Sequence, residues 1–398
     1  MQPAQERGGE KTAAMPLRYV GRLGWNVSLG LLLLLGVTQS TVTGQTGEKS
    51  QVQPSSPAPT MDLHRGEVIP FNTPGPHVIT SKIKCGPGGD IYAIYSSTRE
   101  ISSAPVRRIS VSSRSVTDYP IRTISGYKIL ARASFDVSAD GTLYALFQAM
   151  PQSGSDSKPD PVYLIVKYKD DGQVDSYFPL GDVPGKQMQP TSIAMFGADN
   201  ALVSGTTLLK NPGGTSLGVF SATFDRGGTF RAPVTLMKLD APAKSSASSK
   251  SPDPNSPDHG DAISLASSLY SFSASDGNVY VLQGGRLDVV SPFGSIEHEF
   301  DLPPPADKLI PFQMASIGAS HLFVRYDHLS TGDLAEDNKY RGIITVVQSQ
   351  TGEVTFVYRM PQDENDFAVA ACAASLSDFL FLGSDDHNNL QVVHYLPK

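Results

Sequence analysis

The chain has 398 residues, with 39 acidic and 32 basic side chains and a formal net charge of -7. No block of Lys and Arg interrupts this mildly acidic composition, which argues against nucleic acid or an anionic lipid surface as the main partner. The 36 Gly and 30 Pro favour a protein of short strands and turns, because both residue types interrupt long helices.

The N-terminus has the features of an export signal. Arg18 and Arg22 precede an apolar run at 29–37, and small or polar residues follow up to a possible cleavage site at 42–44. The run is shorter than the about 20 residues that span a bilayer, so we expect cleavage, with anchoring as the alternative. The sequence thus predicts a cleavable signal peptide over 1–44. We expect a secreted, periplasmic or cell-envelope protein with no membrane attachment after cleavage.

Two segments lack the apolar residues that a folded core needs. Residues 45–62 are rich in Gln, Ser, Pro and Thr and are predicted to form a disordered linker. Residues 240–260 form a similar low-complexity loop within the rest of the chain. The remaining sequence, 63–398, is predicted to form a single domain.

A short phrase recurs along that domain: a polar Asp/Gly turn, then an apolar strand with an aromatic residue. It is clearest at 88–94, 139–146 and 275–282, with weaker copies at 198–203, 319–324 and 376–381. Repetition at a period of tens of residues is typical of propellers and other repeat arrays. We interpret the phrase as structural, with Asp and Gly forming the turn and residues such as Tyr144 and Tyr280 packing between repeats.

Between the phrases lies a second recurring element, a β-hairpin with Gly at its turn. Examples span 163–178, 219–230, 287–300 and 343–358. Gly suits these turns because tight hairpins require a positive φ angle. Each repeat therefore contributes four antiparallel strands, which describes one blade of a β-propeller.

The two ends of the domain are predicted to meet. The last repeat supplies three strands and ends after 390–396, whereas 66–71 has the pattern of a fourth, outermost strand. A ring closed in this way avoids exposed sheet edges. We therefore predict an all-β, six-bladed β-propeller with four-stranded antiparallel blades, the last completed by the N-terminal strand.

Over 63–398 the repeated phrase, for example Asp276-Gly277-Asn278-Val279-Tyr280, resembles the six-bladed propellers of the NHL and TolB-like superfamily. The resemblance implies the fold and leaves the activity open. Enzymes of this shape, such as gluconolactonases and glutamine cyclases, keep catalytic or metal residues at one mouth of the central channel. None of their motifs matches this sequence, so no catalytic or cofactor-binding residue is assigned.

The two cysteines are candidates for a disulfide. Cys85 lies on the innermost strand of the first repeat, and Cys372 lies at nearly the same register in the last. The two strands become neighbours when the ring closes, and a disulfide between them in an exported protein would staple the closure. The alternative is two buried thiols that act as small apolar side chains.

Polar candidates for a metal site are confined to two loops. One contains Asp385, Asp386 and His387, and the other begins at Asp327 and His328. Oxygen-rich loops can bind Ca²⁺, and His with carboxylates can bind a transition metal. Neither loop has the alternating spacing of a dedicated Ca²⁺ loop, so we favour solvent-facing turn residues and assign no cofactor.

Long connections are predicted on one face only. They join second to third strands at 150–161, 208–216 and 328–339, and successive repeats at 240–260 and 303–311. An elaborated face on a plain scaffold is typical of a binding site. We therefore predict a monomeric binding or scaffolding module for a protein, small-molecule or carbohydrate ligand. The alternatives are a hydrolase or lactonase, lyase or cyclase with an acidic site at the channel mouth, and a purely structural envelope protein.

Overall fold

The computed structural model describes residues 58–398 with gaps. The gaps are 99–102, 122, 153–159, 186, 198–199, 212–213, 237–269, 284, 303, 307–308, 329–342 and 362–369. The predicted signal peptide, most of the predicted linker and the low-complexity loop 240–260 therefore lie outside the described residues.

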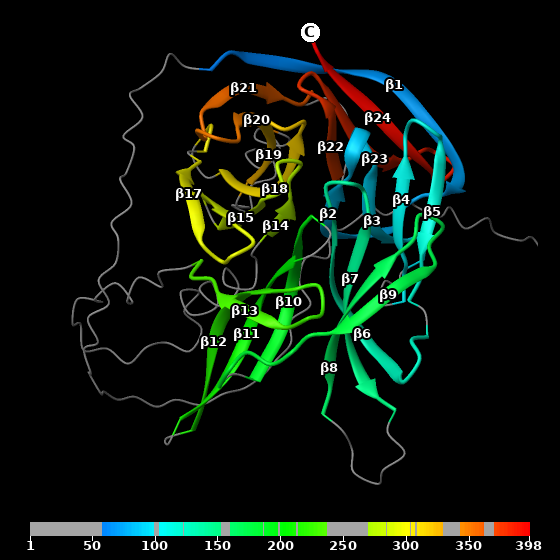
Figure 1. Ribbon diagram of the computed structural model, residues 1–398. Coiled ribbons are helices and arrows are strands. Elements are labelled where there is room, and N and C mark those ends of the chain that lie inside the picture. Colours follow the sequence, from blue (N-terminus) through cyan, green and yellow to red (C-terminus); the bar gives the residue numbers. More distant parts are fainter. Residues whose placement is uncertain are drawn as a thin grey trace, which may run out of the picture. The chain divides into compact units, whose positions relative to one another are not determined.

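Four sheets of four antiparallel strands account for most of the described strands (Figure 1). The first holds β2 (Val78–Cys85), β3 (Ile91–Ser96), β4 (Val106–Ser110) and β5 (Ser115–Tyr119). The second holds β6 (Tyr127–Val137), β7 (Leu143–Pro151), β8 (Val162–Tyr168) and β9 (Val174–Pro179). The third holds β10 (Gln187–Phe196), β11 (Asn200–Asn211), β12 (Gly214–Phe224) and β13 (Phe230–Pro233), and the fourth β14 (Tyr270–Ser273), β15 (Val279–Gln283), β16 (Arg286–Val290) and β17 (Ile296–Asp301).

The remaining strands form one eight-stranded sheet. Its order is β18 (Leu309–Ile317), β19 (His321–His328), β20 (Ile343–Gln348), β21 (Val354–Arg359), β1 (Thr60–Pro74), β24 (Asn389–Pro397), β23 (Asp378–Ser384) and β22 (Ala370–Ser375). β1 pairs antiparallel with β24, and its first residues, 60–62, pair in parallel with 357–359 of β21. The last residue, Lys398, donates its N–H to the carbonyl of Asp62 at 3.0 Å.

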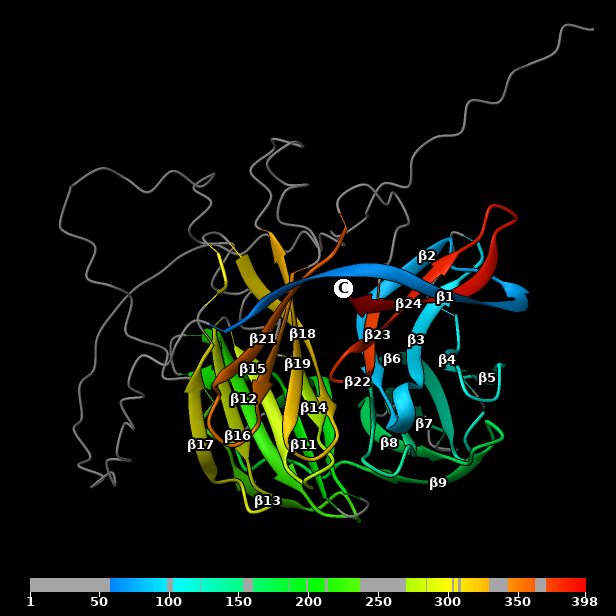
Figure 2. The ribbon, with the colours of Figure 1, turned by 90° about the horizontal axis from the view of Figure 1, so that it is seen from above.

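β1 explains why the sheet count differs from the six separate blades expected from the sequence. The N-terminal strand lies beside the C-terminal strand, as 66–71 predicts, but it also continues onto β21. Figure 2 shows this long strand running from β21 to β24. Two groups of four strands are thereby joined into one sheet. β1 also begins inside the segment 45–62, because main-chain pairing to β21 needs no apolar side chains.

The first strands of the groups form a closed ring. Each of β2, β6, β10, β14, β18 and β22 contacts the next, and β22 contacts β2. Hydrophobic cores fill the spaces between neighbouring sheets, as between the first and second and between the second and third. Sheets that radiate from a central ring and pack face to face make this an all-β β-propeller.

The repeated phrase has the structural role that the sequence predicts. Asp140 and Asp276 each accept a hydrogen bond at 3.0 Å from the backbone N–H two residues on. Tyr144 packs in the core shared with the third sheet, and Tyr280 packs in the core shared with β18 and β19. The phrase thus forms the inner turns and the packing between sheets.

The outer hairpin turns, which join the third and fourth strands of a group, pack against the last strand of the preceding group. The turn glycines Gly172, Gly228, Gly294 and Gly352 all have positive φ angles. A Cβ atom at these glycines would meet, in order, Asp118, Pro179, Ala232 and Phe300 of the preceding group. Glycine is therefore required at these turns both by the backbone conformation and by the close approach of the preceding group.

The first sheet makes the equivalent contact with β1. Arg114, with a φ of 51°, occupies its outer turn, and Nη2 of Arg114 lies 3.3 Å from Oε1 of Glu67 in β1. β1 thus takes the place that the outermost strand of a preceding group takes elsewhere in the ring.

Candidate functional site

Two oppositely charged side chains meet where the inner strands converge. Lys84 is the penultimate residue of β2, and Asp136 is the penultimate residue of β6. Nζ of Lys84 lies 3.1 Å from Oδ1 of Asp136, and the two side chains are only 7% and 1% exposed. A single charge buried in this way would cost several kcal/mol, on the order of 3 to 5, so each side chain depends on the other.

The carboxylate of Asp136 is held on its second oxygen as well. Oδ2 accepts hydrogen bonds from the backbone N–H of Met195 at 2.9 Å and from Oγ of Ser273 at 2.5 Å. The contact between Oδ1 and Lys84 is an ion pair without the angles of a hydrogen bond. The carboxylate is therefore oriented by β10 and β14 and neutralised by β2.

Lys84 reaches across the ring to the fourth sheet. Its Nζ donates to the carbonyl of Ser271 and lies 4.9 Å from the centre of the Tyr270 ring. The Tyr270 hydroxyl lies 2.7 Å from the carbonyl oxygen of Ile83 and 3.0 Å from that of Met314, and donates to one of them at a time. Burial, reinforced by the charge of Asp136, raises the pKa of Tyr270 and keeps this hydroxyl a donor at neutral pH.

We call Lys84, Asp136, Tyr270, Ser271 and Ser273 the axial cluster. Lys84, Asp136 and Ser273 lie at the ends of inner strands that lead into the short inner turns, so this part of the cluster sits toward that face of the propeller. Tyr270 and Ser271 begin β14. The buried Lys84 and Asp136 have their charged atoms engaged by protein partners. The cluster is therefore built to hold opposite sides of the ring together rather than to present a reactive group.

Sequence reasoning missed the axial cluster. The available signal was a charged residue with apolar neighbours at matching positions of two strand ends, Lys84 between Ile83 and Cys85 and Asp136 between Phe135 and Val137. The aromatic partners on the adjacent strands, Tyr92 and Tyr144, pair with these two positions. Two unlike charges at one register of neighbouring repeats would have predicted an ion pair between the repeats.

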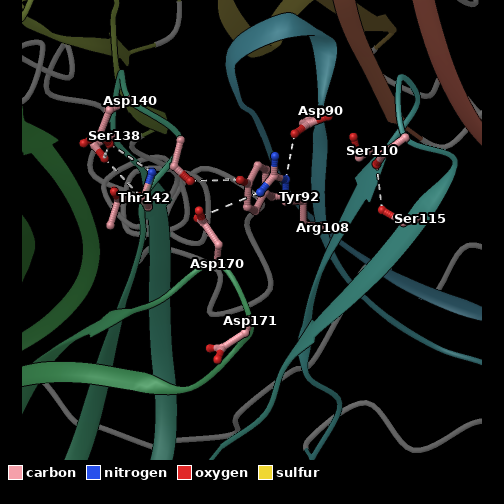
Figure 3. A network of polar contacts seen from close by, with 12 residues as sticks. Asp90, Tyr92, Arg108, Ser110, Ser115, Ser138, Asp140, Thr142, Asp170 and Asp171 are labelled. Carbon is pink, nitrogen blue, oxygen red and sulfur yellow. Dashed lines mark hydrogen bonds and ion pairs between the residues drawn. The ribbon is translucent and has the colours of Figure 1, made fainter.

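A second polar network joins the first two sheets (Figure 3). Nε of Arg108 lies 2.7 Å from Oδ2 of Asp90, and Nη1 lies 4.0 Å from Oδ1 of Asp170 in the second sheet's outer turn. The Tyr92 hydroxyl donates to the carbonyl of Gly141 at 2.9 Å, and burial raises the pKa of Tyr92. The network fixes the short turns of one sheet against the next.

The loop around Asp385 is a hydrogen-bonded turn. Oδ1 of Asp385 accepts from the backbone N–H of His387 at 2.9 Å and of Asn389 at 2.7 Å. These bonds, the Asn389 bond above all, hold the pKa of Asp385 below its usual range. Asp386 and His387 are exposed. The carboxylate oxygen is thus occupied by the backbone, which matches a solvent-facing turn better than a metal site.

The other metal candidates are not brought together by the described residues. His328 ends β19, but its side chain and the loop 329–342 lie outside the described part of the chain. Within the ranges given above, no three His, Cys, Asp or Glu side chains converge in a way that could hold a metal ion. A site that includes His328 stays a prediction.

A small hollow lies between the fourth sheet and β18–β19. Its polar lining includes Asp276, Tyr280, Ser316, His321 and Ser349, and it leaves no room for a water-sized molecule. The hollow is therefore not a ligand site.

The two cysteines are joined in the structure. Cys85 and Cys372 form a disulfide with their Cα atoms 5.6 Å apart and a sequence separation of 287. The bond connects β2 of the first sheet to β22 at the end of the eight-stranded sheet. It therefore crosses the same junction of the ring as the pairing of β1 with β24.

The long connections are only partly described. Because successive strands are antiparallel, connections from second to third strands and from one group to the next leave the same face, which we call the connection face. The predicted loop 208–216 is instead mostly strand, since β11 and β12 continue as a paired hairpin to Asn211 and Gly214. Main-chain pairing lengthens the hairpin there. Most of the residues at 150–161, 240–260 and 328–339 lie outside the described ranges.

In the described part of the chain, no helix is long and apolar enough to cross a bilayer.

No protein-family model and no curated protein matches the sequence. Among solved structures, the chain is similar to a luciferin-regenerating enzyme at 8% identity and a TM-score of 0.42, over 83% of this chain and 95% of that chain. It is also similar to the Pan2 WD40 domain of Neurospora crassa at 7% identity and a TM-score of 0.38, over the same shares. At such low identities and TM-scores, neither likeness assigns an activity or a family to this chain.

Proposed function

We propose that the chain is an exported, six-bladed β-propeller that binds a partner at its connection face. The eight-stranded sheet counts as two blades in this proposal, with β1 as the outermost strand of the last. Support comes from the closed ring of six first strands and from Arg114, whose turn contacts β1 as other outer turns contact a preceding strand. The finer likeness to NHL and TolB-like propellers remains a prediction.

The axial cluster is the observation that favours the connection face as the binding site, because, among the described residues, it leaves few free polar groups at the opposite end of the axis. Lys84, Tyr270 and Asp136 meet near the short-turn end of the axis with their polar atoms engaged inside the protein. The short turns also use their polar groups internally, as Asp140 and Asp225 do. The connection face, where the sequence places its longest loops, therefore offers a ligand more residues that are not already engaged in the turns of the scaffold.

Export is supported by the leader sequence and by the disulfide. Cys85–Cys372 is a pairing that persists in oxidising compartments and is rare in reducing ones. A monomeric, soluble module outside the cytoplasm, with a protein, small-molecule or carbohydrate ligand, fits both features. Amino-terminal sequencing of the exported protein tests the cleavage, which we expect close to residue 44.

The rival proposal is an enzyme with a carboxylate site at the mouth of the axis. Metal analysis of the purified protein separates the two. Tightly bound Ca²⁺ or Zn²⁺ that is lost on Asp386→Ala would support the enzyme. A binding module predicts no stoichiometric metal and no thermal shift with either ion.

The binding proposal is tested by changing one face at a time. Replacing 329–339 with a short Gly/Ser linker alters the connection face, and Phe293→Ser alters the opposite face at an 81% exposed side chain. Both variants are compared with the wild type in binding to a glycan array and to proteins of the exported fraction. We expect the loop variant to lose its ligand and Phe293→Ser to keep it; the reverse pattern would refute the assignment of the face.

A further inference from the structure

The two cysteines of the disulfide differ in burial. Cys372 is completely buried, in a core that includes Ile83, Leu380 and Val392. Cys85 ends β2 and is only partly buried, just before the short turn at Pro87–Gly89. Cys85 therefore keeps some solvent exposure close to the short-turn face, whereas Cys372 keeps none.

The position of the cysteines in the chain sets when they can meet. Cys85 belongs to the first sheet and Cys372 to the last group of strands, 287 residues later. β2 and β22 become neighbours only when the ring closes, together with the pairing of β1 and β24. The burial of Cys372 is produced by the same packing, so it is already in place when the bond can form.

We propose that Cys85 is a thiol–disulfide exchange site, at which an external disulfide oxidises the closed ring, and that Cys372 is the internal resolving thiol. The Cys85 thiolate attacks the oxidant's disulfide, forming a mixed disulfide and releasing one thiolate of the oxidant. The Cys372 thiolate then attacks Sγ of Cys85, which releases the oxidant's second thiolate. The two protein thiols lose two electrons and two protons, and the oxidant's disulfide becomes a dithiol.

Access explains the order of the two steps. Exchange requires the attacked and attacking sulfur atoms to approach in line, so a bulky oxidant needs an exposed cysteine. Cys372 offers no exposed surface in the closed ring, whereas it lies within bonding reach of Cys85. The proposal holds whatever ligand the connection face binds.

Single-cysteine variants test the proposal with glutathione disulfide as the probe. Cys372→Ala retains Cys85, and Cys85→Ala retains Cys372. Mass spectrometry follows the uptake of one glutathione, in native buffer and in urea. We expect Cys85 to react within about tenfold of its rate in urea, and Cys372 to react at least about a hundredfold slower than in urea, because only local unfolding exposes it. Equal protection of the two thiols, or faster reaction of Cys372, would overturn the assignment.

The wild-type chain gives a second measurement that does not depend on the variants. The protein is reduced, returned to native buffer and pulsed with iodoacetamide, and the two cysteine peptides are quantified. Labelling of Cys85 ahead of Cys372 is expected. Equal labelling would show that the ring does not close before the bond forms, which contradicts the proposal.

Discussion

The carbonyl oxygen of Pro179 occupies the space in which a side chain on Gly228 would begin, because a Cβ atom there would lie 2.0 Å from it. The same turn is tied to the second sheet by a 2.8 Å hydrogen bond from the N–H of Gly181 to the carbonyl of Gly228. Spacing between neighbouring sheets is thus set by backbone atoms at the outer turns.

Gly228→Ala is expected to destabilise the protein more than Gly126→Ala. Both glycines have a φ of 79°, but a Cβ at Gly126 would meet nothing within 4 Å. The strain of a positive φ, about 1 to 2 kcal/mol, is common to both variants, so their difference measures the contact between the sheets. Urea unfolding at neutral pH gives the two values. Equal losses would show that the outer turn moves aside at no cost.

Removing either charge of the axial pair is expected to cost more than removing both. Lys84→Met leaves Asp136 buried beside an apolar side chain, and Asp136→Leu leaves Lys84 in the same position. Each single change is expected to lower the free energy of unfolding by about 3 to 5 kcal/mol, and the double variant to recover much of that loss. A double-mutant cycle by urea unfolding measures the coupling. Additive losses in the cycle would mean that the two charges do not depend on each other.

The disulfide is expected to be present in the protein as isolated. Thiol titration of denatured, unreduced protein should find no reactive thiol, whereas a count of two would contradict the bond between Cys85 and Cys372. Replacing both cysteines with Ala is expected to lower the free energy of unfolding by about 5 kcal/mol, because the bond restricts a very long loop in the unfolded chain. Comparison with the reduced wild type separates this effect from the change of side chains.

Acid is expected to weaken the outer turn of the third sheet. Hydrogen bonds from the backbone N–H of Thr229, and then of Gly227, hold the pKa of Asp225 below its usual range. A carboxyl with a lowered folded-state pKa stabilises the fold above its unfolded pKa, near 3.9, and this contribution is lost as the pH falls through the folded value.

Asp225→Asn should therefore lose less stability than the wild type between about pH 5 and pH 2.5. Urea unfolding at several pH values measures the slope for both proteins. Asp182→Asn, at an exposed aspartate, serves as the matched control and should follow the wild type. If Asp225→Asn lost as much stability as the wild type between these pH values, Asp225 would not contribute to the acid sensitivity.

Local chemistry made most of the fold predictable. Asp140 and Gly141 form a turn through contacts within five residues, so the sequence pattern carries the structure directly. The pairing of 60–62 with β21 has no such signature, because main-chain hydrogen bonds form it without particular side chains. The eight-stranded sheet therefore could not be read from the sequence, although the meeting of β1 and β24 could.

The site was less predictable because its residues meet only in the closed ring. Asp385 is one of several adjacent polar residues in the sequence, and in the structure its carboxylate accepts hydrogen bonds from the backbone of its own turn. Lys84 and Asp136 lie in different strands, far apart in sequence, and β10 and β14 supply their remaining partners. A run of adjacent polar residues in the sequence indicates a turn. A cluster assembled from several strands has its residues scattered along the sequence and forms no such pattern.

The hydrogen bond between Lys398 and Asp62 places the start of β1, the first described strand, beside the end of β24, the last. A short peptide that joined residue 398 to residue 60 would leave every ladder of the ring in place. New ends could then be opened in a connection elsewhere, such as the one between β17 and β18. The ring has no structurally privileged first sheet, and such a circular permutant would place a fused tag or domain at whichever seam is chosen.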